Sequence, residues 1–371
     1  MSSFHSIHVT SDSWREACDG VLAGIDHPAE GQLAFIYVAE ELAGDTDRML
    51  DYLRGRSGIA HWVGCVGMGL CSSGRETYAE PGLSVLTTPF AEEDFRLIPA
   101  LDDNMKDWLD ATRGWRERTL ASVAVVHGDP SNTRLPAQLI ELSDGLQGGF
   151  LIGGIASAER LAVQIADRAG GGGLSGVLFS GRVSITTGLS QGCSLIGNRH
   201  QITGCQRNII QTIDDRPALD VFKEDIGEVL ARDLQRVGGY IFAALPIPGS
   251  DTGDYLVRNL IGIDPDQGLL AIGDLAHPGM EVQFARRDAD TAREDLVHMI
   301  EGLLSRLPGP ARGALYHSCL GRGRNLFGED AAEMQLVKRL LGDVPLAGFY
   351  ANGEISHHRL YGYTGVLTLF S

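Results

Sequence analysis

The stretch VPLAGFYANGEISHHRLYGYTGVLTLF, residues 344 to 370, contains a pattern that occurs two more times in this chain. Apolar residues lead to Gly348, small residues and Gly353 follow, and the alternating segment GVLTLF ends the stretch. Small residues after a buried strand let the backbone turn tightly, or let another group approach without interference from a Cβ atom. The pattern therefore predicts a strand, a tight turn and a second strand.

The other two copies align with the first through a glycine. HWVGCVGMGLCSSGRETYAEPGLSVLTTPF (61–90) places Gly64 level with Gly348, and GGFLIGGIASAERLA (148–162) places Gly153 there. Upstream of each copy lies an apolar run, and a segment with helical spacing separates the run from the glycine. The runs are LAFIYVAE (33–40), SVAVVHGD (122–129) and GALYHSCLGRG (313–323). Each unit thus predicts a strand, a loop, a helix, a strand, a small-residue turn and a strand.

Apolar runs joined through a helix imply parallel neighbours connected by a right-handed crossover, whereas the last strand of a unit can return antiparallel. The helical segment of the last unit, AAEMQLVKRLLG, has one apolar face. That face contains Met334, Leu336, Val337, Leu340 and Leu341. We predict an α/β chain of mixed α+β type, whose repeated units form two similar halves around mixed sheets with flanking helices.

The region 238–300 differs from the repeats. GGYIFAALP indicates a strand, and GLLAIGD with MEVQFARRD indicates a hairpin, with Gly279 following Pro278 in the turn. DADTAREDLVHMIEGLLSRL begins with residues suited to an N-cap and continues as an amphipathic helix.

A segment rich in Gly, Ser and Thr, around 180–215, is the expected junction of the two halves. The predicted organisation is an N-terminal segment (1–29) followed by two domains, 30–215 and 216–371.

The composition restricts the partners and the compartment. The chain has 371 residues, 48 acidic against 31 basic side chains and a formal net charge of −17, so its field repels nucleic-acid phosphates and anionic membranes. We find neither a signal-peptide pattern nor an apolar run of membrane-spanning length, and we expect a cytoplasmic protein. The 6 cysteines form no C-x-x-C pair, which predicts reduced thiols and argues against a structural zinc site.

Glu354, His357 and His358 are residue types that bind metals. The first copy has Ser73 in place of His357, and the E-x-x-H spacing follows a glycine-rich turn, where residues i and i+3 point in different directions. We therefore interpret the histidines as part of a solvated loop and expect no metal. Glu354 is level with Glu159 in the second copy and with Leu70 in the first. It is a ligand contact or structural anchor in a cleft, or else a surface carboxylate.

HSCLGRGRNLFG (317–328) follows a predicted strand and precedes a predicted helix, an arrangement whose backbone N–H groups can hold an anion. Its G-x-G spacing lacks the third glycine of a dinucleotide fingerprint. Arg322 or Arg324 would suit a carboxylate or phosphate. Cys319 is a nucleophile, a ligand contact or a buried apolar residue, and Cys65 and Cys193 raise the same question with less context.

Five stretches together resemble the FIST family, which is named from F-box and intracellular signal transduction proteins. They are SCLGRGRNLFG (318–328), VPLAGFYANGEI (344–355), LSQGCSLIG (189–197), TGCQRNIIQTIDDRPALDVF (203–222) and DYLVRNLIGIDPDQGLLAIGDLAHPGMEVQFARRD (254–288). The resemblance covers roughly residues 30–371, which correspond to the N- and C-terminal halves of that family.

The resemblance implies a sensory protein that binds a small ligand, an amino acid or another small carboxylate, and signals through a separate partner protein. The ligand-binding residues it implies are Cys319, Gly321, Arg322, Gly323, Tyr350, Asn352 and Glu354. An Arg and a Glu at neighbouring strand ends match the carboxylate and the ammonium group of an amino acid. The alternative is a salt bridge between Arg322 and Glu354 themselves.

Two other functions stay open. One is an enzyme that acts on a small polar substrate through Cys319 or Glu354, although we favour binding over catalysis. The other is a gas sensor that binds heme noncovalently, since one FIST branch is reported to bind heme and the chain has no C-x-x-C-H attachment motif. Its axial ligand would come from His200, His317, His357 and His358. Apart from that alternative we expect no cofactor.

Overall fold

The computed structural model describes residues 3–25, 32–231, 234–247 and 254–371. The chain forms two compact units, one containing Met1–Gln191 and Arg293–Ser371 and the other containing Gly192–Ala292. The switch from the first unit to the second falls inside the segment 180–215. Parts of the predicted N-terminal segment, residues 1–2 and 26–29, lie outside the described residues. The predicted mixed α+β class with repeated units and flanking helices is confirmed.

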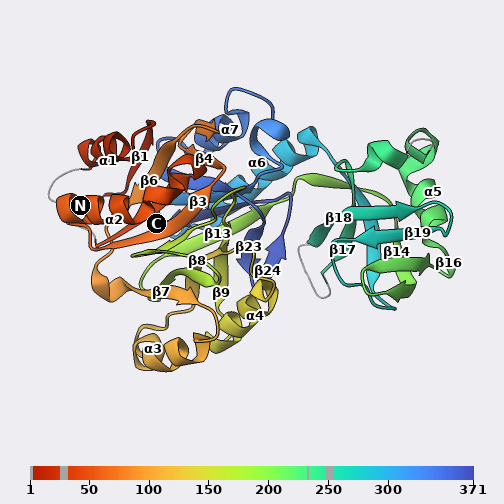
Figure 1. The fold of residues 1–371 in the computed structure, drawn as a ribbon, viewed down its shortest axis with the longest axis horizontal. Helices are drawn as coiled ribbons and strands as arrows, with labels where there is room; N and C mark the ends of the chain where they lie inside the picture. Colours follow the sequence, from red (N-terminus) through yellow and green to blue (C-terminus); the bar gives the residue numbers. More distant parts are fainter. Residues whose placement is uncertain (1–2, 26–31, 232–233, 248–253) are drawn as a thin grey trace. The chain divides into compact units, whose positions relative to one another are not determined.

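The first unit consists of three repeats with one order of elements (Figure 1). Repeat 1 contains β1 (His5–Thr10), α1 (Trp14–Ala23), β2 (Leu33–Ala39), α2 (Thr46–Ser57), β3 (His61–Gly67), β4 (Gly69–Ser72), β5 (Arg75–Tyr78) and β6 (Gly82–Thr87). Repeat 2 contains β7 (Phe95–Leu101), α3 (Met105–Thr119), β8 (Val123–Gly128), α4 (Leu135–Gly145), β9 (Phe150–Ile155), β10 (Gln164–Ala166), β11 (Ala169–Gly170) and β12 (Leu174–Phe179). Repeat 3 contains β13 (Ile185–Ser190), α6 (Ala289–Arg306), β21 (Gly313–Cys319), α7 (Ala332–Leu341), β22 (Leu346–Ala351), β23 (Glu354–His357), β24 (Arg359–Tyr361) and β25 (Gly365–Phe370). The second unit is inserted between β13 and α6.

Strand pairing follows the same rule in every repeat. The two strands joined by the central helix are parallel, as in β2–β3, β8–β9 and β21–β22, and the last strand returns antiparallel, as predicted. The small-residue turn is extended into a hairpin, and this hairpin pairs with a different repeat. The hairpin β4–β5 joins β22, β10–β11 joins β3, and β23–β24 joins β9. Three six-stranded sheets therefore interlock cyclically.

The aligned glycines are required by the parallel pairs. A Cβ atom on Gly64, Gly153 or Gly348 would lie 1.7, 1.8 or 1.8 Å from the carbonyl oxygen of the residue opposite in the neighbouring strand. Because no side chain can occupy that position, the glycine lets the two strands keep hydrogen-bonding distance. The sequence repeat thus reflects a steric requirement that is the same in all three copies.

The residue that follows each glycine faces the centre of the first unit. Its parallel partner is Tyr37 in repeat 1, His127 in repeat 2 and His317 in repeat 3. The three rings are fully buried, and their centroids lie 5.7 to 6.0 Å apart. Phe349 stacks on Tyr37 at 5.0 Å and fills the space beside them. The Tyr37 hydroxyl lies 2.9 Å from His317 Nε2.

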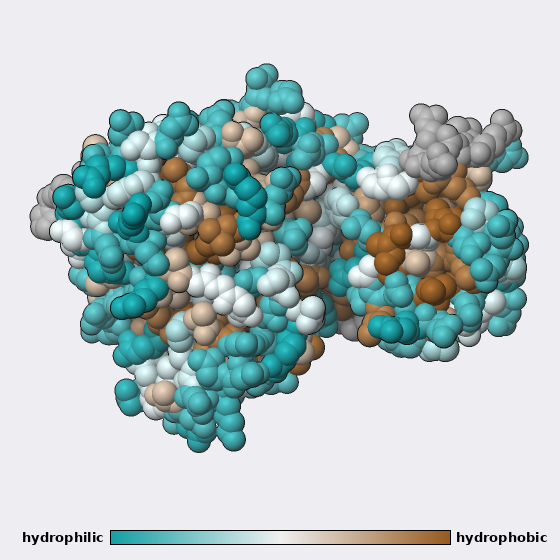
Figure 2. Space-filling model, viewed as in Figure 1, coloured by the Kyte–Doolittle hydropathy of each residue, from teal (hydrophilic) through white to brown (hydrophobic). Residues whose placement is uncertain are grey.

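Helices cover the outer faces of the sheets. Buried residues of α1 and α2 pack on repeat 1, and those of α3 and α4 pack on repeat 2. In the view of Figure 2 the outer surfaces of α3 and α4 are mostly hydrophilic. Among the described residues, no helix combines the length and hydrophobicity needed to cross a bilayer.

The second unit is a seven-stranded sheet with one helix packed on it. Its elements are β14 (Cys193–Gln206), β15 (Ile209–Ile213), β16 (Arg216–Pro217), α5 (Ala218–Ala231), β17 (Ile241–Pro246), β18 (Tyr255–Asp264), β19 (Leu269–Ile272) and β20 (Glu281–Arg287). The long strand β14 pairs with β20 in its first half and with β15 in its second half, so the sheet closes on itself. Phe222 of α5 contacts Phe284 of β20 with ring centroids 4.8 Å apart.

The predicted strand at 238–246 and the predicted helix at 288–307 are confirmed as β17 and α6. The predicted hairpin is wrong, because β19 pairs with β18 and β15, whereas β20 pairs with β17 and β14. The turn at Pro278 and Gly279 is present, but the chain that contains it crosses to another part of the sheet. Neighbours in sequence were a poor guide here because long-range partners compete for both strand edges.

Candidate functional site

Glu354 is the first residue of β23, and its place in the sheet identifies its counterparts. It pairs with Gly154 of β9, while Gln164 of β10 pairs with Cys65 and Leu70 of β4 pairs with Phe349. In each case the partner is the residue after the aligned glycine. The predicted equivalence with Leu70 is confirmed, but the one with Glu159 is wrong. Glu159 lies in the exposed connection between β9 and β10, which is longer than the turn in repeat 3 and shifts the register.

The Glu354 carboxyl group is fully buried. Its Oε2 accepts hydrogen bonds from the Thr364 backbone N–H at 3.1 Å and the Thr364 hydroxyl at 2.8 Å. Its Oε1 accepts no N–H or O–H donor from the described residues. Burial raises the pKa of Glu354 to about 8, although the bonds from Thr364 favour the charged form. The side chain is therefore an acid poised near neutral pH, and the Cys319 thiol is its other side-chain hydrogen-bond neighbour.

Cys319, the last residue of β21, lies beside this carboxyl group. Its sulfur accepts a bond from the Gly321 N–H at 3.5 Å, and its carbonyl oxygen accepts one from the Arg322 N–H at 2.8 Å. Burial and then the Glu354 carboxyl raise the pKa of the thiol well above its usual value. Because the nucleophilic form of cysteine is the thiolate, this environment disfavours a catalytic role for Cys319.

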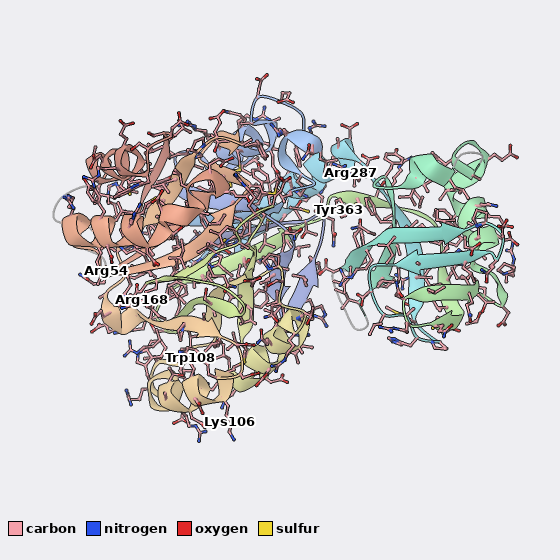
Figure 3. All side chains as sticks on the ribbon, viewed as in Figure 1. Arg54, Lys106, Trp108, Arg168, Arg287 and Tyr363 are labelled. Atoms are coloured by element: carbon pink, nitrogen blue, oxygen red, sulfur yellow. The ribbon has the colours of Figure 1, made fainter. Side chains whose placement is uncertain are left out.

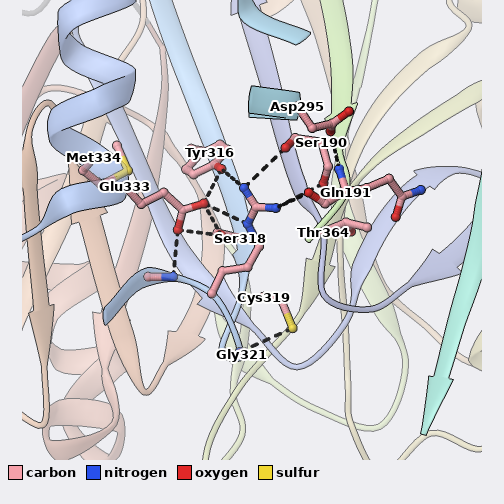
Figure 4. Close-up of polar contacts among 12 residues, drawn as sticks. Ser190, Gln191, Asp295, Tyr316, Ser318, Cys319, Gly321, Glu333, Met334 and Thr364 are labelled. Atoms are coloured by element: carbon pink, nitrogen blue, oxygen red, sulfur yellow. Dashed lines mark hydrogen bonds and ion pairs between the residues drawn. The ribbon is translucent and has the colours of Figure 1, made fainter. Parts of the chain in front are cut away.

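The ion-pair partner of Arg322 is Glu333 and not Glu354. It is fully buried, and its Nε lies 2.8 Å from Oε1 of Glu333, which is also fully buried (Figure 4). Glu333 also accepts bonds from the Tyr316 and Ser318 hydroxyls and from the Gly323 N–H. Arg322 is thus the centre of a structural network. The predicted ion pair exists with a different carboxylate.

The sequence analysis did not identify Glu333. The sequence feature that could have identified Glu333 is its place at the start of the amphipathic segment 331–342. It lies four positions before Val337, so it is on the apolar face. The structure buries Glu333 together with Met334 and Val337 of α7. A carboxylate on a helix face that packs against a sheet needs a buried cation, and Arg322 supplies it.

Gly323 and Tyr350 lie on the other side of the loop, against Tyr78 of the first hairpin. Gly323 has a φ of 48°, and a Cβ atom there would lie 1.9 Å from the Tyr78 hydroxyl oxygen. The rings of Tyr350 and Tyr78 have centroids 4.8 Å apart. Asn352 is exposed in the turn after β22, and its N–H donates to the Ile155 carbonyl oxygen at 3.0 Å. These residues and Glu354 therefore do not line one surface.

The histidines named as possible metal or heme ligands contact groups other than Glu354. The half-buried ring of His357 lies 5.2 Å from that of Phe150, and the His358 ring lies 4.3 Å from that of His357 at a tilted angle (centroid distances). His200 lies between Asp214 and Asp225, at 2.6 and 2.9 Å. Within the described parts of the chain, no three His, Cys, Asp or Glu side chains form a group that could hold a metal ion. His317 packs in the filled centre of the first unit, an environment that leaves no room for a heme against it.

The turn that carries Thr364 covers the Cys319 loop. A Cβ atom on Gly321 would lie 2.9 Å from the Tyr363 ring, so only glycine permits this contact. Tyr363 is half-buried, has a φ of 60° and is labelled in Figure 3. Two surface hollows of about 550 Å³ lie elsewhere, one lined by His61, Glu92 and Phe95 and the other by residues of α3 and α4. Neither hollow is lined by Glu354, Cys319 or Gly321.

Two protein-family models match most of the chain. Residues 32–216 match the FIST N domain, and residues 218–357 match the FIST C domain. The uncharacterized protein Rv0628c of Mycobacterium tuberculosis is 33% identical over 373 residues, which cover 91% of this chain and 94% of that protein. The uncharacterized protein Mb0898c of Mycobacterium bovis is 31% identical over 335 residues, which cover 83% and 82% of the two chains. This chain therefore belongs to the FIST family.

Proposed function

We propose that this protein is a cytoplasmic sensory protein that binds a small ligand at Glu354 and signals through a separate partner protein. FIST domains are associated with sensory ligand binding in signal transduction. The observation that carries the proposal is the Glu354 carboxyl group, which is fully buried and has an oxygen without an N–H or O–H donor among the described residues. A buried acceptor of this kind costs folding free energy unless a donor reaches it.

The ligand that suits this site donates a hydrogen bond to a carboxyl group. An amino group matches it, so an amino acid or another small primary amine is the proposed class. Arg322 is not available for the carboxylate of such a ligand, because Glu333 and backbone carbonyl groups occupy it. The backbone of the Cys319–Gly323 loop is the alternative donor surface for that carboxylate. Glu354, Cys319, Gly321 and Thr364 then form the ligand contact, and Arg322 holds the loop in place.

The test is native mass spectrometry of protein purified without added ligand, followed by calorimetric titration with the amino acids and with ethylamine. Wild type should carry or bind a small amine, and Glu354→Gln should bind it at least tenfold more weakly. Glu159→Gln is the matched control, since the same change is made on an exposed carboxylate of repeat 2. Equal affinity of Glu354→Gln and wild type for every bound amine would exclude Glu354 as the site.

A further inference from the structure

Arg322 contacts the point at which the chain leaves the first unit. One guanidinium nitrogen, Nη1, donates to the carbonyl oxygens of Ser190 and Gln191 at 3.3 and 3.1 Å. The other, Nη2, lies 3.4 Å from the Ser190 hydroxyl oxygen. Ser190 is the last residue of β13, and the second unit begins one residue after Gln191. The arginine that holds the Cys319–Gly323 loop therefore also holds the outgoing connection.

The returning connection is attached to the same point. The Gln191 backbone N–H donates to the Asp295 carboxylate at 2.6 Å, as Figure 4 shows. Asp295 lies in α6, three residues after the second unit ends at Ala292. Gln191 is thus bound through its carbonyl oxygen by Arg322 and through its N–H by Asp295. Both connections between the two units are therefore hydrogen-bonded at Gln191 or by it.

We infer that Arg322 is a positioning residue that couples the Glu354 ligand site to the two connections of the second unit, through Gln191 and Asp295. This inference rests on the proposed function for the ligand site, but the contacts themselves belong to the ligand-free protein. A small displacement of the Cys319–Gly323 loop moves the Arg322 backbone, whose N–H is bonded to the Cys319 carbonyl oxygen. Five hydrogen-bond acceptors hold the planar guanidinium group. Arg322 cannot change rotamer without breaking these bonds, so a displacement of its backbone is transmitted to Ser190 and Gln191.

Arg322 interacts electrostatically with a second buried carboxyl group, that of Glu354, besides its ion pair with Glu333. It contacts Glu333, and its charge favours the ionised form of Glu354. Because burial keeps Glu354 mostly protonated near neutral pH, an ammonium ligand that binds it as an ion pair converts it to the carboxylate and adds a negative charge near Arg322. Ligand binding at Glu354 therefore changes the electrostatic potential at Arg322, which is hydrogen-bonded to Ser190 and Gln191.

The inference is tested by hydrogen–deuterium exchange of the ligand-free full chain. Asp295→Ala removes the tie to Gln191 without burying an unpaired charge, and Arg322→Lys keeps the charge but removes the planar fork. In both variants, amides of 190–196 and 286–296 should exchange at least tenfold faster than in wild type. Amides of β2, β8 and β21 should stay protected, which shows that the first unit is folded. Glu301→Ala, an exposed carboxylate on the same helix, is the control and should leave exchange unchanged.

Two results would overturn the coupling. One is that folded Arg322→Lys accelerates exchange only in 319–333, with 190–196 as protected as in wild type. The other is that Asp295→Ala matches Glu301→Ala throughout. Because no ligand is added, neither result depends on whether Glu354 binds an amine, and failure of the calorimetric titration would leave these exchange results intact.

Discussion

Nε of Arg322 lies 2.8 Å from Oε1 of Glu333, and neither side chain is accessible to solvent. A buried ion pair of this kind makes the loss of one partner costly, because the other charge is left unpaired in a low-dielectric environment. The pair links the loop that follows β21 to the first turn of α7.

Arg322→Met should lower the free energy of unfolding by about 3–5 kcal/mol, since Glu333 then lacks its cation. Arg339→Met, on the exposed side of α7, should stay within about 0.5 kcal/mol of wild type. Urea denaturation followed by circular dichroism measures both. Equal stability of the two variants would show that Glu333 is neutral or hydrated in the folded protein.

Gly64→Ala should be strongly destabilising, because its Cβ atom would lie 1.7 Å from the Ile36 carbonyl oxygen and would force β2 and β3 apart. We expect a loss of about 3 kcal/mol or more. Gly55→Ala is the counterpart in α2, where a Cβ atom meets nothing within 4 Å. It should raise stability by about 0.5–1 kcal/mol. Thermal unfolding of both variants checks the steric explanation of the repeat.

The protein should lose stability steeply below pH 6.5. Burial lowers the pKa of His8 and of His317 to about 3, and lowers that of His127 well below its usual value. Between the unfolded value of 6.5 and these folded values, only the unfolded chain takes up the protons. Each histidine then costs about 1.4 kcal/mol per pH unit. His127→Leu should reduce the slope of stability against pH by about that amount between pH 4 and 5.5, where the unfolded histidine is fully protonated.

His298→Leu is the control for this slope, since His298 lies on the exposed side of α6. Its slope should equal that of wild type. If His127→Leu also kept the wild-type slope, His127 would have to be protonated in the folded protein, which requires an acceptor or counter-charge near it.

Glu354 should produce the opposite pH dependence. Its folded pKa of about 8 lies above the ordinary value of 4.5, so between these values the folded state holds a proton that the unfolded state releases. This stabilisation is complete below pH 4.5 and is lost as the pH rises through 8. Relative to wild type, Glu354→Gln should therefore gain about 1.4 kcal/mol per pH unit over that window. Parallel stability curves for Glu354→Gln and wild type would show that the carboxylate is already charged at low pH.

An amide at this place is compatible with the fold, because Gln164 occupies the equivalent position in repeat 2. Its Nε2 donates to the carbonyl oxygens of His127 and Gly173 at 2.7 Å each. Glu159→Gln, on the exposed connection of repeat 2, should give a curve parallel to that of wild type.

The helices, the strands and the repeat could be predicted from local sequence patterns. Gly64, Gly153 and Gly348 could be aligned by pattern because each copy meets the same local steric requirement, and helical and strand periodicities are properties of short segments. The parallel and antiparallel pairing inside each repeat followed from the length of the connections. The family could be recognised for the same reason, since its motifs are contiguous.

The partners of these strands and side chains could not be predicted, because they come from distant parts of the chain. The hairpins exchange between repeats, so Gln164 rather than Glu159 is the counterpart of Glu354, and Arg322 pairs with Glu333 rather than with Glu354 or a ligand. Likewise β19 and β20, adjacent in sequence, lie apart in the sheet. These choices depend on which buried charges and strand edges meet in space, and the free energy of such long-range contacts is not encoded in any short stretch.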